Sequence, residues 1–335
     1  MWSCKCESPE DICICLRITD DPFAFLNHTT PSNMDTAELA ALIITVSIEL
    51  VLGMALNLYI LLVYIGNLKN GVSLGPSDKV HLTKALVNVS MIVTMNTQCI
   101  MCYRWSCLLL TKEFFLGSVI IVMFLIFYNY WLTAMLCVYY CTSITTCGHH
   151  IFVWLKRSLS SYLLPILLVL GLCSFAVSIP AFWFGSLNPP RNSTGSFQVT
   201  FVQTIPYRIT FTILGCILPL TIVLLSTTIT SWSLINHMWR MRKNNGEFPS
   251  SKFQTQINAT RTMILFLLIS VIYCLTEMAF STITISPSLV ILIWFYDIFY
   301  PISEAVIIIQ GSAKLRRTLL EKFINRKEKN CKEET

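Results

Sequence analysis

Seven long apolar stretches, separated by short polar spacers, run through most of this 335-residue chain. Each is long enough to cross about 30 Å of hydrocarbon at a rise of about 1.5 Å per residue. The sequence therefore predicts an all-α membrane protein with seven transmembrane helices. The predicted helices cover residues 39–65, 85–102, 114–144, 161–185, 207–235, 262–285 and 288–310.

The composition supports a chain that folds within a lipid bilayer. Charged residues make up 13% of it and apolar residues 54%, whereas a soluble domain carries about 25% charged residues. We expect an N-terminal tail at 1–38, a helical domain at 39–310, and a tail with a short amphipathic helix at 311–335. Met34 is an alternative start to Met1, which would make residues 1–33 an extension outside the native protein.

The positions of Lys and Arg predict that the N-terminus lies outside the cell, because positive residues in short loops stay on the cytoplasmic side. The net charge of +6 then faces an anionic inner leaflet and a cytosolic partner rather than nucleic acid. The outer segments hold Lys5, Arg17, Arg104, Lys112, Arg191 and Arg208. The inner loops hold Lys69, Lys79, Lys84, Lys156, Arg157, Arg240, Arg242, Lys243, Lys252 and Arg261, and more follow in the C-terminal tail.

Two glycosylation sequons agree with this orientation. They begin at Asn27 and Asn192, and both fall outside, whereas a third at Asn258 falls on the cytoplasmic side. We therefore expect glycans at Asn192 and Asn27.

The sequence predicts neither an enzyme nor a cofactor or metal site. It has no Walker loop, no HExxH and no nucleophile motif in a suitable context. The adjacent His149 and His150 would point in different directions on a helix. Cysteines within the apolar stretches are interpreted as small packing residues. The four cysteines of the outer tail could form two disulfides.

Ionisable and amide side chains within the predicted helices suggest specific roles, because burying them in hydrocarbon is costly. Glu49, Gly53 and Asn57 share one face of the first helix, and Asn57 could hydrogen-bond to Asn88 of the second. Glu304 is expected in a switch or a helix-packing network.

Two further carboxyls, Glu277 and Asp297, could face an outward-open cavity and anchor a cationic ligand. Alternatively, each is protonated or bonded to a neighbour such as Tyr273 or Tyr296. In the third helix, Tyr128, Trp131 and Met135 share a face, which fits either ordinary packing or a ligand site.

Several segments together resemble the bitter-taste receptors, taste receptor type 2. The third helix reads WLTAMLCVYYCTSI from Trp131 and is followed by IFVWLKR from Ile151. Further similar segments, in the family's order, are Glu49-x3-Gly53-x3-Asn57-x2-Ile60, Ser233-Leu234-x2-His237-x3-Met241, Pro249-Ser250, Phe266-Leu267-Leu268 with Tyr273, and Ile307-Ile308-Ile309-x-Gly311-x2-Lys314-Leu315.

The resemblance spans nearly all of residues 34–323 but departs from the family at several positions. Asn88 stands in place of a usual arginine and Ser143 in place of a common lysine. Glu304-Ala305 replaces a usual His-Ser, and Gln256 replaces a histidine before the sixth helix.

The resemblance implies a G-protein-coupled receptor bundle in the plasma membrane that binds small, often bitter organic ligands and activates a heterotrimeric G protein. It places Trp131, Met135 and Trp294 in the ligand pocket and Tyr273 at the aromatic switch of the sixth helix. Tyr128, Glu277 and Asp297 join the pocket from the analysis of helix faces.

On activation, the sixth helix is expected to move outward at its cytoplasmic end. The G protein would then meet Lys156, Arg157, Arg240, Arg242 and Lys243. A vomeronasal-type pheromone receptor and a small-molecule transporter are the alternatives, although no inverted repeat is found.

Overall fold

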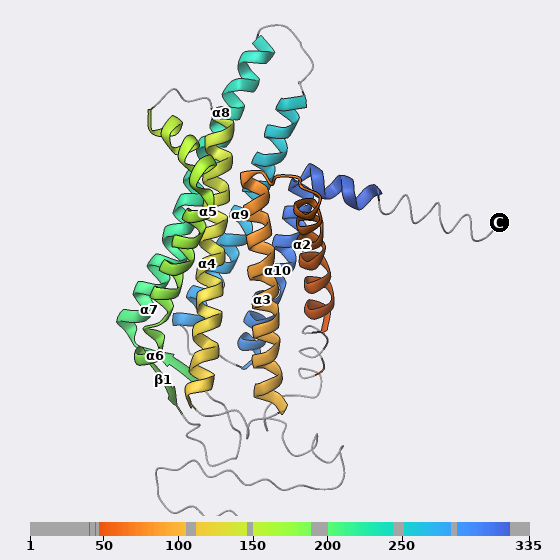
Figure 1. Ribbon diagram of the computed structural model, residues 1–335. Coiled ribbons are helices and arrows are strands. Elements are labelled where there is room, and N and C mark those ends of the chain that lie inside the picture. The colour runs from red at the N-terminus through yellow and green to blue at the C-terminus, as the bar shows by residue number, and fades with distance from the viewer. Residues whose placement is uncertain are drawn as a thin grey trace, which may run out of the picture.

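The structure is a computed structural model that describes residues 40, 44, 47–104, 112–145, 150–188, 200–243, 251–282 and 287–321. Its described residues form a bundle of seven long helical rods standing side by side (Figure 1). The rods are η1 with α2 (Glu49–Gly53, Met54–Lys69), α3 (Pro76–Arg104), α4 (Lys112–Ile144), α5 (His150–Ser178), α7 with η2 and α8 (Ile205–Thr212, Ile213–Ile217, Leu218–Lys243), α9 (Ser251–Thr282) and α10 (Pro287–Gly311). The predicted seven-helix fold is confirmed.

Five described segments are long and apolar enough to cross a membrane. They are Leu50–Lys69, Gly117–Ile144, Ser161–Trp183, Ile205–Arg240 and Phe253–Thr276, and Phe299–Gly311 is a shorter apolar helix. Rod α3 is not among them, and it carries the buried polar residues His81, Lys84, Asn88 and Asn96. Part of its low hydropathy therefore comes from polar side chains inside the bundle.

Helix α3 begins nine residues earlier than the sequence predicted. Pro76 opens it, which suits a residue with no N–H to donate, and Asp78 adds a negative charge to its first turn. Lys84 therefore lies one helical turn or more inside the bundle. Its assignment to an inner loop was wrong.

Prolines shape two of the other rods. In α5, Tyr162 has non-helical backbone angles (φ −112°, ψ 21°) three residues before Pro165, which kinks the helix. The π-helical turn η2 ends two residues before Pro219, whose missing N–H interrupts the regular hydrogen-bond ladder.

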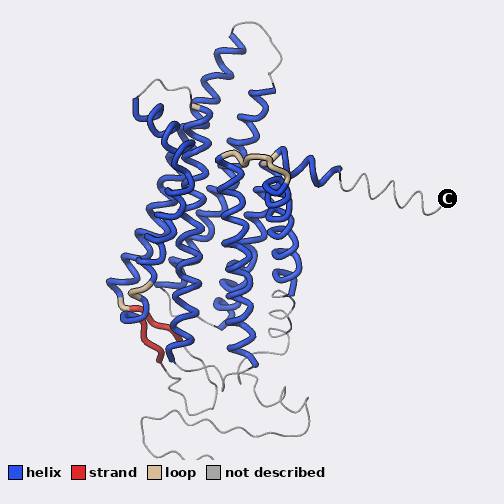
Figure 2. Tube along the Cα trace, in the orientation of Figure 1, coloured by secondary structure: helices blue, strands red, loops and turns tan. Residues whose placement is uncertain are grey.

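The segment after α5 was predicted as helix as far as Gly185, but the structure turns earlier. A single turn of helix α6 (Ala181–Phe184) is followed by strand β1 (Gly185–Asn188). This strand pairs antiparallel with β2 (Thr200–Gln203), with Gly185 opposite Gln203. Figure 2 shows this small hairpin at the outer end of the bundle, opposite the end at which α8 and α9 extend furthest.

The apolar core runs along the centre of the bundle, where α4 contacts α3, α5, α8 and α9. Four cysteines within apolar stretches, Cys137, Cys141, Cys216 and Cys274, are buried as predicted, whereas Cys173 is exposed on α5. The inner end of α10 approaches α9 so closely that a Cβ atom at Gly311 would lie 2.6 Å from Thr262 Oγ1. The two helices are thus packed together at the cytoplasmic end.

Candidate functional site: aromatic side chains beside a polar core

The outer half of α4 carries aromatic side chains on two sides. Tyr128 turns toward α5, where its hydroxyl donates to the Leu167 carbonyl at 3.1 Å and its ring lies against Gly171. Phe124 stacks on it at 5.9 Å between ring centroids. The predicted pocket residue Tyr128 is therefore tied to a neighbouring helix.

Trp131 and Phe127 lie on the side of α4 that faces α7 and η2. Their ring centroids are 6.5 Å apart, and Phe127 lies 5.6 Å from Phe211. A Cβ atom at Gly215 would lie 2.9 Å from the Phe127 ring, so only glycine fits there without a shift. Trp131 is half-buried, as is Met135 one turn inward.

The remaining predicted pocket residues belong to α9 and α10. The backbone of Glu277, Trp294 and Asp297 is helical, but their side chains lie outside the described residues. The structure therefore tests neither the cation-anchor hypothesis nor its alternative for these carboxyls. The glycosylation residues Asn27 and Asn192 also lie outside the described residues.

Three tyrosines meet at the centre of the bundle, and Tyr130 among them lies on the same turn of α4 as Phe127 and Trp131. The Tyr273 ring of α9 lies 4.5 Å from Tyr300 of α10 and 5.3 Å from Tyr130 of α4. Tyr130 and Tyr300 lie 6.1 Å apart, and all three are almost fully buried. The predicted switch residue Tyr273 therefore sits between rings from two other helices.

An ion pair that the sequence analysis missed lies one turn further inward. The Lys84 ammonium donates to Glu304 Oε1 at 2.8 Å, and both side chains have no exposed surface. It also donates to Asn129 Oδ1 at 2.5 Å and to Thr133 Oγ1 at 2.7 Å. All three ammonium protons thus have acceptors, which a buried charge requires.

Amide side chains extend this network to the first helix. Asn129 Nδ2 donates to Glu304 Oε2 at 2.9 Å and to Asn88 Oδ1 at 2.8 Å. Asn88 Nδ2 donates to Asn57 Oδ1 at 3.2 Å, which confirms the predicted bond between the first two helices. Asn57 Nδ2 in turn donates to the Gly53 carbonyl at 2.9 Å. We call Asn57, Lys84, Asn88, Asn129, Thr133 and Glu304 the polar core.

Two positions at which the sequence departs from the resemblance meet in the polar core. Asn88 and Glu304 both belong to this single network. Glu304 was expected in a switch or in a helix-packing network, and it lies in a network that joins α3, α4 and α10. A signal was available in the sequence, since a lysine and a glutamate both fell in or beside apolar helices, but only the fold shows that they meet.

A second polar cluster lies near the inner ends of α2, α3 and α4. The imidazole of His81 lies between two tyrosine hydroxyls, 3.1 Å from Tyr64 and 3.3 Å from Tyr140.

Residues 313–321 form a short helix beyond α10, and Lys314 pairs with Asp78 at 3.6 Å. The Lys314–Asp78 pair holds the start of the tail helix against the start of α3.

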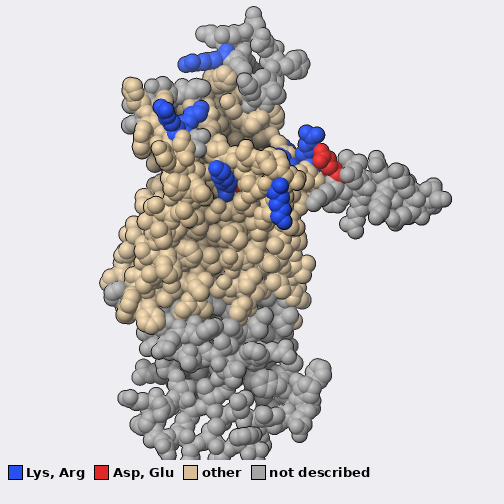
Figure 3. All heavy atoms as spheres, in the orientation of Figure 1, with Lys and Arg blue, Asp and Glu red and all other residues tan. Residues whose placement is uncertain are grey.

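Basic residues gather at this inner end, as Figure 3 shows for the visible face. Lys156 and Arg157 on α5 and Arg240 on α8 are exposed. Arg242 and Lys243 continue α8, with side chains outside the described residues.

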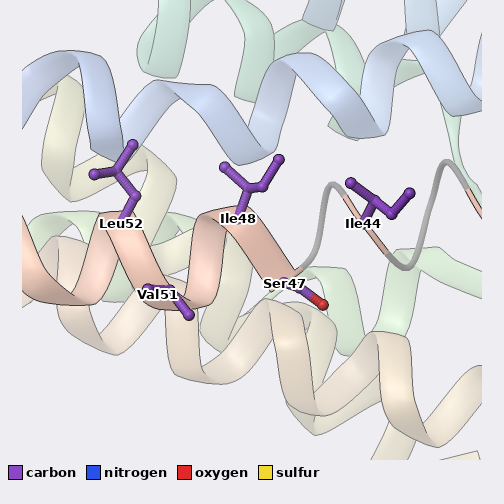
Figure 4. Close-up of a pocket in the computed structure, with 5 residues that line it drawn as sticks. All are labelled: Ile44, Ser47, Ile48, Val51 and Leu52. Carbon is purple, nitrogen blue, oxygen red and sulfur yellow. The ribbon is translucent and has the colours of Figure 1, made fainter.

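A shallow apolar hollow lies along the outer part of the first rod. Figure 4 shows its lining side chains on the first rod and on residues just before it, and Val51 among them is 71% exposed. The lining residues are Ile44, Ser47, Ile48, Val51 and Leu52. A surface of this kind suits lipid chains, so it does not define a ligand site.

Comparison with known proteins identifies the family. The sequence model of the Taste receptor protein (TAS2R) family matches residues 34–327. Taste receptor type 2 member 9 of Macaca mulatta is 26% identical over 198 residues, and that of Homo sapiens is 26% identical over 199. These matches cover 57% of this chain and 63% and 64% of the relatives.

A bird relative extends the comparison. Taste receptor type 2 member 40 of Gallus gallus is 30% identical over 154 residues, covering 44% of this chain and 49% of the relative. The chain thus aligns with about half to somewhat less than two thirds of the length of these curated relatives. The matches do not favour the vomeronasal or transporter alternatives. With its seven rods and a match over most of its length, the chain is a multi-pass membrane protein that belongs to the taste receptor type 2 family.

Proposed function

We propose that this protein is a chemosensory receptor for small, bitter-type organic compounds that signals through a heterotrimeric G protein. Its membership of the taste receptor type 2 family supports this proposal most strongly. In the structure, the half-buried Trp131 beside Phe127 and the glycine at 215 offer an aromatic surface near the middle of α4. Such surfaces suit flat, partly apolar ligands.

The ligand would lie between α4, η2, α9 and α10. It would contact Trp131, Met135 and Trp294, with Tyr128, Glu277 and Asp297 at the edges of the site. Tyr273 would transmit the change inward, because it packs against both α4 and α10. Binding would favour an arrangement in which the inner half of α9 moves outward.

The G protein would meet the basic inner end of the bundle. Lys156, Arg157, Arg240, Arg242 and Lys243 would face acidic groups on the partner. Retention of positive charge on the cytoplasmic side would by itself place bases here, so these residues are the least specific part of the proposal.

Calcium release in cells that co-express the chain with a promiscuous taste-type G protein tests the function. The chain would be started at Met1 and at Met34 and exposed to a panel of bitter compounds. We expect a dose-dependent response that Trp131→Ala abolishes while surface expression is kept. Trp232→Ala is the matched control, since Trp232 is 68% exposed on α8.

Two results would contradict the proposal. A receptor that reaches the surface and stays silent to the whole panel would speak against bitter-type ligands. Equal loss of response and of surface expression in Trp131→Ala would indicate a packing role for this tryptophan.

A further inference from the structure

The polar core joins four of the seven rods into one unit. Its hydrogen bonds run from α2 through α3 and α4 to α10, and the Lys84–Glu304 pair closes the connection between α3 and α10. Every polar atom of the Lys84 ammonium and of the Glu304 carboxylate has a partner within the network. A network satisfied in this way fixes the helices that contribute to it.

The same turns of α4 and α10 carry the rings that hold Tyr273. Tyr130 follows Asn129 directly in α4, and Tyr300 lies one turn before Glu304 on the same face of α10. The Tyr273 ring packs between them, at 5.3 Å and 4.5 Å. We call this arrangement of Tyr130 and Tyr300 the tyrosine seat.

Helix α9 meets the joined rods along one face. Phe266 lies two turns inward of Tyr273, and its ring centroid is 5.6 Å from the Lys84 ammonium. Met263 and Ser270, on the same face, are buried as well. At the inner end, the close approach of Thr262 to Gly311 shows that α9 lies against α10 in this structure. We call this packed position the inward arrangement of α9.

From this geometry we propose that the Lys84–Glu304 ion pair is a positioning device for Tyr273. By holding α4 and α10 at the polar core, the pair keeps the tyrosine seat at the spacing that fits the Tyr273 ring. It thereby keeps α9 inward and sets how readily the receptor switches. The link to switching rests on the proposed function, whereas the positioning of Tyr273 does not.

The alternative is that the pair serves folding alone. A buried charge left without its partner destabilises a protein, so either single substitution would harm the bundle whichever role the pair has. Removing both charges together separates the two roles, because an apolar pair of similar volume often restores stability. The seat would still lose its fixed spacing.

Cys274 supplies a readout of the seat that needs no signalling. It follows Tyr273 in α9 and is only 4% exposed, so it should react with N-ethylmaleimide only when α9 moves. Cys141 of α4 is likewise only 4% exposed and reports general loosening of the bundle. The exposed Cys173 of α5 reports access of the reagent.

The experiment compares the full chain with the double variant Lys84→Met/Glu304→Leu in membranes. Labelling of each cysteine peptide is followed over time by mass spectrometry. We expect Cys274 to react roughly fivefold faster or more in the double variant, with Cys141 and Cys173 unchanged. An unchanged rate at Cys274, or an equal acceleration at Cys141, would overturn the proposal.

A second variant keeps the test decisive if the double variant does not fold. Tyr300→Leu removes one ring of the seat and leaves the ion pair in place. It should speed labelling of Cys274 to a similar degree, whereas Tyr162→Leu, at an exposed tyrosine of α5, should not. Continued protection of Cys274 in Tyr300→Leu would also overturn the proposal.

Calcium measurements on the same variants separate this inference from the proposed function. Faster labelling together with raised ligand-independent signalling supports both. Faster labelling in a protein that never activates the G protein supports the tyrosine seat and counts against the proposed coupling.

Discussion

Lys84 is the side chain on which the interior of the bundle depends most. Its ammonium is fully buried and donates hydrogen bonds to acceptors on α4 and α10. Lys84→Met would leave the Glu304 carboxylate without its counter-charge. We expect the free energy of unfolding to fall by about 3–5 kcal/mol, measured by thermal unfolding of the purified receptor.

Lys79→Met is the matched control for this prediction. Lys79 lies on the same helix but is exposed, so its replacement should change stability by no more than about 0.5 kcal/mol. A melting temperature of Lys84→Met equal to that of the Lys79 variant would mean that the buried pair contributes no net stability.

Two glycines allow an equally local prediction. A methyl group at Gly215 would press on the Phe127 ring, so Gly215→Ala should cost about 1–3 kcal/mol through overpacking. Gly66 lies within α2 with nothing near the position of a Cβ atom, so Gly66→Ala should stabilise the helix by roughly 0.5–1 kcal/mol. Thermal unfolding of both variants checks these opposite changes in stability. Destabilisation by Gly66→Ala would contradict the open space beside Gly66.

Among the helices, the contact between the inner ends of α9 and α10 is the one that the proposed switch must break. A Cβ atom at Gly311 would lie 2.6 Å from Thr262 Oγ1 and 3.0 Å from its Cγ2, so Gly311→Ala pushes α9 away. We expect a higher ligand-independent calcium signal for each receptor at the surface. Adding Thr262→Ala removes the obstructing atoms and should return the signal to the original level.

The outcome of this pair of variants is specific to the contact. A raised signal that Thr262→Ala does not reverse would point to a change elsewhere in α10. No rise in Gly311→Ala, at normal surface expression, would show that separation of these ends does not lead to signalling.

The sequence predicted the helices best, because a long apolar stretch in a bilayer can satisfy its own backbone hydrogen bonds only by forming a helix. The predicted ends of α4 and α10 differ from the observed ends by two residues or fewer. The start of α3 was missed because its first turns are polar, and their burial depends on partners in α4 and α10. Hydropathy along one segment carries no information about such partners.

For the whole molecule, the orientation in the membrane decides which functions are possible. The described bases at the ends of α5 and α8 lie at the same end as the short tail helix (Figures 1 and 3). With that end inside, we expect glycosylation at Asn192 and none at Asn258. Asn192→Gln should therefore abolish a glycosidase-sensitive mobility shift, and Asn258→Gln should leave it unchanged. The reverse result would invert the assigned topology.

The candidate site was less predictable than the orientation. The bond between Asn57 and Asn88 could be predicted, because both residues lie in the inner halves of neighbouring helices. The pairing of Lys84 with Glu304 could not, since 220 residues separate them. Tyr128 illustrates a similar limit, because helical spacing placed it beside Trp131 but did not show that its hydroxyl bonds to α5.

The ion pair also constrains how this receptor can be recombined with its relatives. A chimaera that joined α3 of this chain to α10 of a relative lacking the glutamate would inherit one buried charge without the other. The same holds along a lineage, where neither residue can be exchanged first without a poorly folded intermediate. Transfer of the aromatic surface around Trp131 to another receptor would therefore require that α3 and α10 be moved together or left together.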